Sequence, residues 1–171
     1  MSQTDFVAPV KAIKQKTVIE VNELIRHLHK IIKERGYSTL IEQSHKESTD
    51  DNGDRSISFD WFAKKKVSNY VKLVLEISFD ASVKNITIEK ENKKTTVQEG
   101  SVSITIGGYT QKDYEDEWGL RKESSFRKVF REFYDKIIDR DRMGAKEKEF
   151  LNDIKLITNE MKAYLKMHRI D

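Results

Sequence analysis

The densest cluster of carboxylates in the sequence follows the last stretch of alternating apolar residues. It consists of Asp113, Glu115, Asp116 and Glu117. If this segment is helical, Asp113 and Glu117 share a face, and paired carboxylates can bind Mg²⁺ or take part in acid–base catalysis. Acidic residues ahead of a helix also stabilise its positive N-terminal end without any other role. Because no His, Lys or Arg motif completes a catalytic set beside them, we expect no catalytic residues and leave the role of this acidic patch open.

Two groups of lysines fall in or near predicted hairpin loops, where they could bind phosphates. They are Lys64, Lys65 and Lys66 in one region, and Lys90, Lys93 and Lys94 in the other. If these loops gather at one edge of a sheet, they form a basic rim for a nucleic acid, with Phe62 and Tyr70 as stacking surfaces. However, Glu89 and Glu91 share the region, and lysines commonly keep strand edges soluble. Both interpretations stay open at the level of sequence.

Other residues that could bind a metal or a cofactor are badly placed for it. His27 and His29 are two residues apart on a predicted helix, so they point to nearly opposite sides and cannot share an ion. The loop 50–54 resembles a calcium loop, but that register places Arg55 at the glycine position and Trp61 at the glutamate position, so a hairpin turn fits better. The chain also has no cysteine and no glycine-rich phosphate-binding motif. We expect no metal, no cofactor and no enzymatic activity.

The charge balance argues against a dedicated nucleic-acid binder. Among 171 residues, 32 Lys and Arg stand against 29 Asp and Glu, for a net charge of +3, whereas nucleic-acid binders usually concentrate a stronger positive field. No apolar run is long enough to span a membrane, and residues 1–16 have no secretory-signal pattern. We expect a cytoplasmic protein without membrane contact. Its expected partner is another protein or a second copy of itself, with nucleic acid as the alternative.

The start of the chain predicts a flexible arm followed by one domain. Residues 1–16 hold the only proline among mixed small and polar residues, while residues 17–171 show no break in composition. Thr17 and Glu20 match a capping box, and the apolar residues after them have helical spacing. Gly36 is a natural end for this first helix.

Alternating apolar residues then predict a series of strands joined by short turns. These strands are centred on residues 38–47, 57–61, 71–79, 86–88 and 102–106. A turn is expected at residues 80–82, where Asp, Ala and Ser follow one another. Because Val97 is out of step with the alternation of the last strand, residues 91–100 are either a loop or contain a bulge near Gly100.

The end of the chain returns to helical spacing. Apolar stripes over residues 126–137 and 150–165 predict two helices. Strands grouped together and helices grouped apart define an α+β fold. The expected architecture is a single antiparallel meander of about five strands, with one N-terminal and two C-terminal helices packed on one face.

The face of the sheet turned away from the helices is where we expect an interaction. It is mostly polar, but Phe62, Tyr70 and Val74 break the pattern and are candidates for protein contact. Alternatively, the N-terminal arm or a loop covers these three residues, or they are single exposed apolar residues without a role. The leading hypothesis is a non-enzymatic interaction or assembly module. The alternatives are an RNA- or ribosome-associated factor using the lysine loops and, more weakly, a protein that holds a small ligand between sheet and helices.

Overall fold

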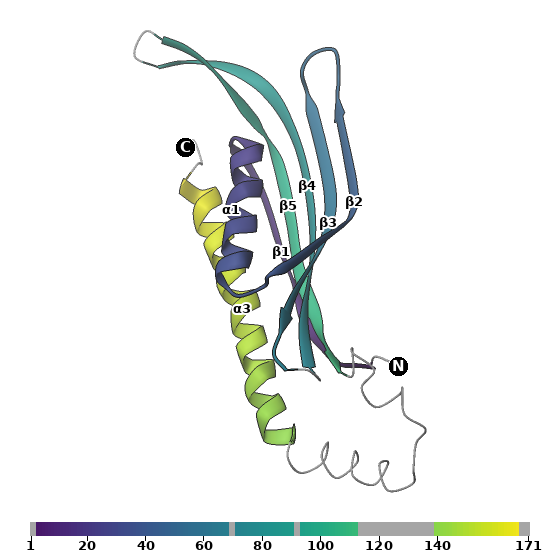
Figure 1. The fold of residues 1–171 in the computed structure, drawn as a ribbon. Helices are drawn as coiled ribbons and strands as arrows, with labels where there is room; N and C mark the ends of the chain where they lie inside the picture. The colour runs from purple at the N-terminus through teal and green to yellow at the C-terminus, as the bar shows by residue number, and fades with distance from the viewer. Residues whose placement is uncertain (1–2, 69–70, 91–92, 113–138, 168–171) are drawn as a thin grey trace, which may run out of the picture.

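The computed structural model describes residues 3–68, 71–90, 93–112 and 139–167, and all structural statements refer to these residues. Its sheet has five antiparallel strands in the order β1-β5-β4-β3-β2 (Figure 1). These are β1 (Gln3–Val18), β2 (Thr39–Thr49), β3 (Arg55–Lys66), β4 (Val71–Lys90) and β5 (Lys93–Lys112). Strands β2 to β5 form the predicted meander, and β1 pairs with β5 to complete the sheet.

Among the residues that the structure describes, two helices pack on one face of this sheet, which corrects the prediction of three. They are α1 (Val21–Glu34) and α3 (Asp139–Met167), and they lie side by side (Figure 1). The apolar stripe at 126–137, which predicted the third helix, lies outside the described residues. The stripe at 150–165 is part of α3, and Gly36, with a φ of +89°, follows the end of α1 as expected.

The sequence predicted about five strands, but it divided them wrongly. No turn occurs at residues 80–82, because β4 pairs with β5 without a register shift from Val71 opposite Lys112 to Lys90 opposite Lys93. Asp80 and Ser82 resemble turn residues only because they lie on the polar face, while Ala81 between them stays buried. Neither the loop nor the bulge proposed for residues 91–100 is present from residue 93 onward, since this stretch is regular strand.

In place of the arm expected at residues 1–16, residues from Gln3 onward form the edge strand β1. Ile13 is buried opposite Ile104, and Ala8 is buried nearer the start of the strand. Pro9 lies where the β1–β5 register shifts, and an edge strand tolerates a proline at such an irregularity because no ladder hydrogen bond is needed there. Thr17 therefore belongs to β1 and does not cap the helix.

The start of α1 is stabilised from a distant strand rather than by the predicted capping box. Glu20 occupies the N-cap position but makes no side-chain cap hydrogen bond. Instead the backbone N–H of Ile19 donates to the carbonyl of Gln98 at 2.8 Å, and the N–H of Val21 donates to the Gln98 side chain at 3.3 Å. The part of β5 nearest the β4–β5 hairpin thus fixes where α1 begins.

The helix-covered face contains the core that the alternation predicted. Phe59 stacks on Trp61 and on Phe79, with ring centroids 4.3 Å and 4.7 Å apart. The other buried side chains of this face on β3, β4 and β5 include Ile57, Ala63, Val71, Leu73, Leu75, Ile77, Ala81, Val83, Val102, Ile104, Ile106 and Thr110. A Cβ at Gly108 would come 2.8 Å from the ring of Phe150, so this glycine lets α3 approach the sheet closely.

A partly buried polar cluster, which we call the polar clamp, ties α3 to the end of β3. The Tyr37 hydroxyl donates to Asp153 at 3.1 Å, and the Lys65 ammonium lies 3.0 Å from Glu149 and 3.5 Å from Asp153. Burial, together with the nearby Asp153 charge, raises the pKa of Tyr37, so its hydroxyl stays protonated and acts as a donor. Burial alone would lower the pKa of Lys65, but its hydrogen bond to Glu149 and both carboxylate charges raise it on balance.

Candidate functional site

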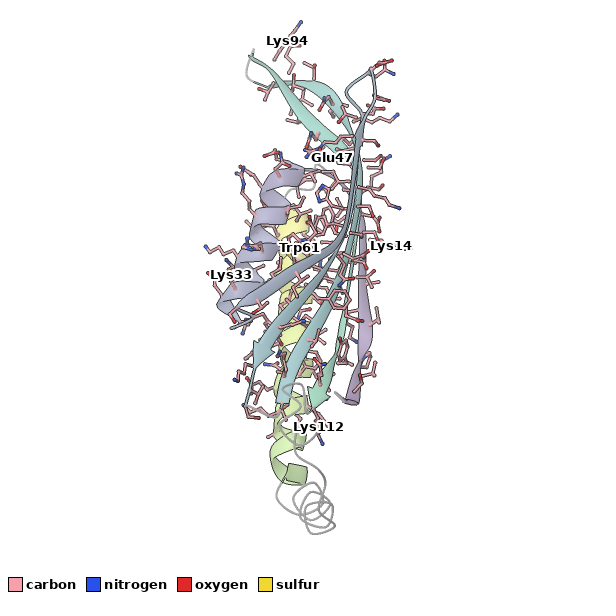
Figure 2. All side chains as sticks on the ribbon, turned by 45° about the vertical axis from the view of Figure 1, so that its right-hand side comes forward. Lys14, Lys33, Glu47, Trp61, Lys94 and Lys112 are labelled. Atoms are coloured by element: carbon pink, nitrogen blue, oxygen red, sulfur yellow. The ribbon has the colours of Figure 1, made fainter. Side chains whose placement is uncertain are left out.

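The open face of the sheet is the side turned away from α1 and α3. In Figure 2, Trp61 lies on the helix side of the sheet, whereas Lys14 lies on the opposite side. No described helix packs on this open face. The strand register sets which of its residues are neighbours, because side chains directly opposite in paired strands share a face.

At one end of the open face, apolar side chains from all five strands lie in two adjacent rows. One row runs Ile41, Phe62, Glu76, Gly107, and the next runs Thr39, Lys64, Val74, Tyr109, Val7. We call the apolar members of these rows, together with Val10, the apolar band: Val7, Val10, Ile41, Phe62, Val74 and Tyr109. A Cβ at Gly107 would lie 3.1 Å from Val10 Cγ2, which places the Val10 side chain over Gly107 on this face.

Three members of the apolar band are strongly exposed. Val7 and Val10, on the edge strand β1, have 70% and 64% of their surface accessible, and Ile41, on the opposite edge strand β2, has 38%. Tyr109 is half-buried, and burial followed by the nearby Glu76 charge raises its pKa. The band is thus an apolar surface with a phenol that stays neutral.

The residues predicted for protein contact are only partly brought together. Phe62 and Val74 lie on the open face of neighbouring strands, with Phe62 half-buried and Val74 fully buried. Tyr70 lies outside the described residues. The sequence analysis missed Val7 and Val10 because it assigned them to an arm. The run of apolar residues from Phe6 to Ile13, broken only by Pro9 and Lys11, was the signal for a strand there.

Further along the open face, a shallow trough of about 740 Å³ crosses the sheet. Two rows of side chains form most of it, and they run from β2 to β1 as Ser48, Ser56, Ser82, Ser101, Lys16 and as Lys46, Ser58, Asp80, Ser103, Lys14. We call it the serine trough. Its floor is built from small hydroxyl side chains and Asp80. One rim carries Lys14 and Lys16 of β1, and the other carries Lys46 and Glu47 of β2, with Glu47 ion-paired to Arg55 at 2.6 Å.

A row of hydrogen-bonded residues separates the trough from the apolar band. Ser44 and Ser78 donate to the two carboxylate oxygens of Asp60 at 2.7 Å and 2.6 Å. These hydrogen bonds, with a smaller effect of the Lys46 charge, hold the pKa of Asp60 below its usual range. Within the described part of the chain, the six serines of the trough form no such bond, so their hydroxyls are available to a ligand.

The lysines predicted to form one basic rim lie at opposite ends of the sheet. Lys64, Lys65 and Lys66 end β3, and Lys66 pairs with Lys72 at the start of β4. Lys90 and Lys93 pair at the other end of β4, and Lys94 lies exposed at this hairpin tip (Figure 2). Measured along β4 at the rise of a strand, about 60 Å of chain lies between Lys72 and Lys90. Lys65 is also held in the polar clamp, so the predicted rim does not form.

The remaining sequence candidates form no second site among the residues that the structure describes. The acidic patch of Asp113, Glu115, Asp116 and Glu117 lies outside the described residues. His27 stacks on Tyr164, and His45 on Phe59, with ring centroids 4.4 Å and 6.2 Å apart. In the part of the chain that the structure describes, no three His, Cys, Asp or Glu side chains gather as metal ligands would. The loop 50–54 forms the predicted hairpin turn, in which Asp50 accepts hydrogen bonds from its own loop.

Comparisons with known proteins give no functional assignment. No protein-family model matches the chain, and no curated protein matches it in sequence. Among solved structures, an uncharacterized protein from Rhizobium leguminosarum shares 5% identity over 94% of this chain and 99% of that chain, with a TM-score of 0.17. A TM-score this low carries no argument. Neither described helix is long and apolar enough to cross a membrane.

Proposed function

We propose that this protein is a non-enzymatic interaction module that binds another protein on the open face of its sheet. The observation that carries the proposal is the apolar band. The covered face of the same strands buries its large side chains under α1 and α3. On the open face, Val7 and Val10 at one edge of the sheet and Ile41 at the other edge remain exposed, with the half-buried Phe62 and Tyr109 between them. Exposed apolar side chains in one patch commonly mark a contact with another protein. A cytoplasmic setting, which the lack of cysteine supports, belongs to the same proposal.

The open face is large enough for a specific protein contact. Five strands at a spacing of about 4.8 Å, over the 12 residues of β3 at about 3.3 Å each, give roughly 950 Å². A stable protein interface buries about 800 Å² on each partner. One partner covering the apolar band and the trough would reach that size.

The charge of the open face favours a different protein over a second copy of this chain. Among the described residues, the lysines of this face outnumber its carboxylates: Lys14, Lys16, Lys46, Lys64, Lys66, Lys72 and Lys84 against Asp60, Glu76, Asp80 and Glu99. Two copies packed face to face would bring two positive surfaces together, which is unfavourable. A partner with a negative surface meets no such cost.

Site-specific photo-crosslinking in the native host tests the proposal. A crosslinking amino acid is placed at Ile41 in the band and, as a matched control, at Leu151 on α3, since both side chains are 38% exposed. We expect a partner protein to crosslink from Ile41 and not from Leu151. The purified partner should then bind the wild-type chain and lose affinity for the double variant Val7→Ser/Val10→Ser.

Three other results would overturn the proposal. Equal crosslinking from Ile41 and Leu151 would show that the band is not the contact surface. A crosslinked product of twice the chain's 20.1 kDa would show self-association instead. Loss of the crosslink after nuclease treatment would favour the RNA-associated alternative.

A further inference from the structure

We infer that the serine trough binds an extended acidic segment of the partner protein, lying across the strands. This inference rests on the proposed function, because it names the part of the partner that the open face recognises. The charge and spacing of the trough residues support it, and neither feature depends on the apolar band.

The lysines stand on the two opposite rims of the trough. Lys14 and Lys16 come from the edge strand β1, and Lys46 comes from the other edge strand, β2. Four strand spacings separate these rims, or about 19 Å. An extended peptide of about six residues covers that distance. Carboxylates near both ends of such a segment would each meet a lysine, and within the described residues neither Lys14 nor Lys16 has an ion-pair partner of its own.

The floor between the rims suits a peptide backbone. Ser56, Ser82 and Ser101 lie side by side, with Ser58 and Ser103 in the next row. Serine hydroxyls can both donate and accept, so they can bind the alternating carbonyl and N–H groups of an extended chain. Their small size leaves the space that the 740 Å³ trough represents.

The position of Asp80 favours an acidic peptide over a nucleic acid as the ligand of the trough. Its exposed carboxylate lies in the middle of the trough, between Ser58 and Ser103, and it has no ion-pair partner within the described residues. A phosphate backbone would bring a negative charge to every position, including this one, whereas a peptide can be acidic at both ends and neutral in its middle. Among the described residues that line the trough, none is aromatic, so none can stack on a base.

The test uses synthetic probes and nuclear magnetic resonance titration of the full chain. The probes are the peptide Glu-Glu-Ser-Ser-Glu-Glu, its matched neutral form Gln-Gln-Ser-Ser-Gln-Gln, and a six-nucleotide thymidine strand. We expect the acidic peptide to shift the amide signals of Ser82 and Ser103, with weaker binding at high salt, and to bind more tightly than the other two probes.

Variants with matched charge changes locate the binding. Lys14→Glu/Lys16→Glu should weaken binding of the acidic peptide about tenfold, since two ion pairs are replaced by repulsions. Lys155→Glu/Lys162→Glu, the same charge change at exposed positions of α3, should leave it unchanged. Asp80→Asn should tighten it, because a central repulsion is removed.

The outcomes separate this inference from the proposed function. Equal loss in both double-lysine variants, tighter binding of the thymidine strand, or no binding of the acidic peptide would each overturn the inference. If the Ile41 crosslink and the effect of Val7→Ser/Val10→Ser remain in that case, the interaction function stands without an acidic segment. If the peptide binds the trough but no crosslink forms at Ile41, the trough still binds acidic peptides, but the proposed interaction function is wrong.

Discussion

The two faces of the sheet are built from alternating residues of the same strands, yet one is covered by helices and the other is open. On the covered face, Phe59 and Phe79 stack and are buried under the helices. On the open face, the immediate neighbours of Phe79 are Ser78 and Asp80, which are partly or fully exposed. The difference in side-chain size and polarity means that the covered face stabilises the fold, while most of the open face can change without unfolding it.

The open face itself is divided. The side chains of its serine trough are mostly small or charged, so a helix packed there would meet no large apolar side chain to bury. Its apolar band does offer such surface, but in only two rows of the sheet. This arrangement is typical of a surface that binds a partner reversibly. It is less typical of a face that a further layer of the same fold covers permanently.

Replacing a large side chain of the covered face should give the largest effect. We expect Phe79→Ala to lower the free energy of unfolding by about 3–5 kcal/mol, because it removes a fully buried ring from the aromatic stack. Ser82→Ala, three residues along the same strand but on the open face, should change it by less than about 0.5 kcal/mol. Urea unfolding of both variants measures the difference, and similar losses would show that the two faces are not distinct.

The polar clamp should give the next largest effect. Asp153→Ala removes the acceptor of the buried Tyr37 hydroxyl and one partner of Lys65. We expect a loss of about 1–3 kcal/mol, since a buried hydroxyl is left without a partner. Tyr37→Phe should cost less, because it removes the donor as well as the hydrogen bond. A larger loss for Tyr37→Phe than for Asp153→Ala in urea unfolding would contradict this expectation, because Tyr37→Phe keeps the ring and leaves no buried hydroxyl without a partner.

Acidification should reveal the hydrogen-bonded row between trough and band. The pKa of Asp60 is lowered in the folded protein by Ser78 and Ser44, so its contribution to stability is present above the unfolded pKa and is lost as the pH falls through the folded value. Between pH 6 and pH 2, the urea midpoint of the wild type should therefore fall more than that of Asp60→Asn. Parallel curves for the two proteins would show that Asp60 makes no such contribution.

The sequence predicted the covered face well because its signal is local. The alternation from Val71 to Phe79 and the helical spacing in α1 and the 150–165 stretch identify buried faces without any knowledge of pairing. The same local reasoning failed at Pro9 and at residues 80–82. A proline on an edge strand and polar residues on an open face both resemble chain breaks when the strand pairing is unknown.

The candidate site could not be predicted in the same way, because it is defined by register. The row that joins Lys46, Asp80 and Lys14 crosses all five strands, and its members are far apart in the sequence. Assigning residues 1–16 to an arm removed Lys14, Lys16, Val7 and Val10 from consideration. Only the pairing of β1 with β5 brings them onto the open face.

The apolar band should show the smallest effect on stability together with a large effect on binding. Val7→Ser/Val10→Ser changes side chains that are 70% and 64% exposed, so the free energy of unfolding should shift by less than about 0.5 kcal/mol. The same variant should weaken binding of the crosslinked partner, since the exposed apolar surface is lost. Ile13→Ser, on the covered face of the same strand, is the opposite control: its side chain is 4% exposed, and it should destabilise the fold. If Val7→Ser/Val10→Ser unfolds the protein instead, the band belongs to the core and the two faces of β1 have the same role.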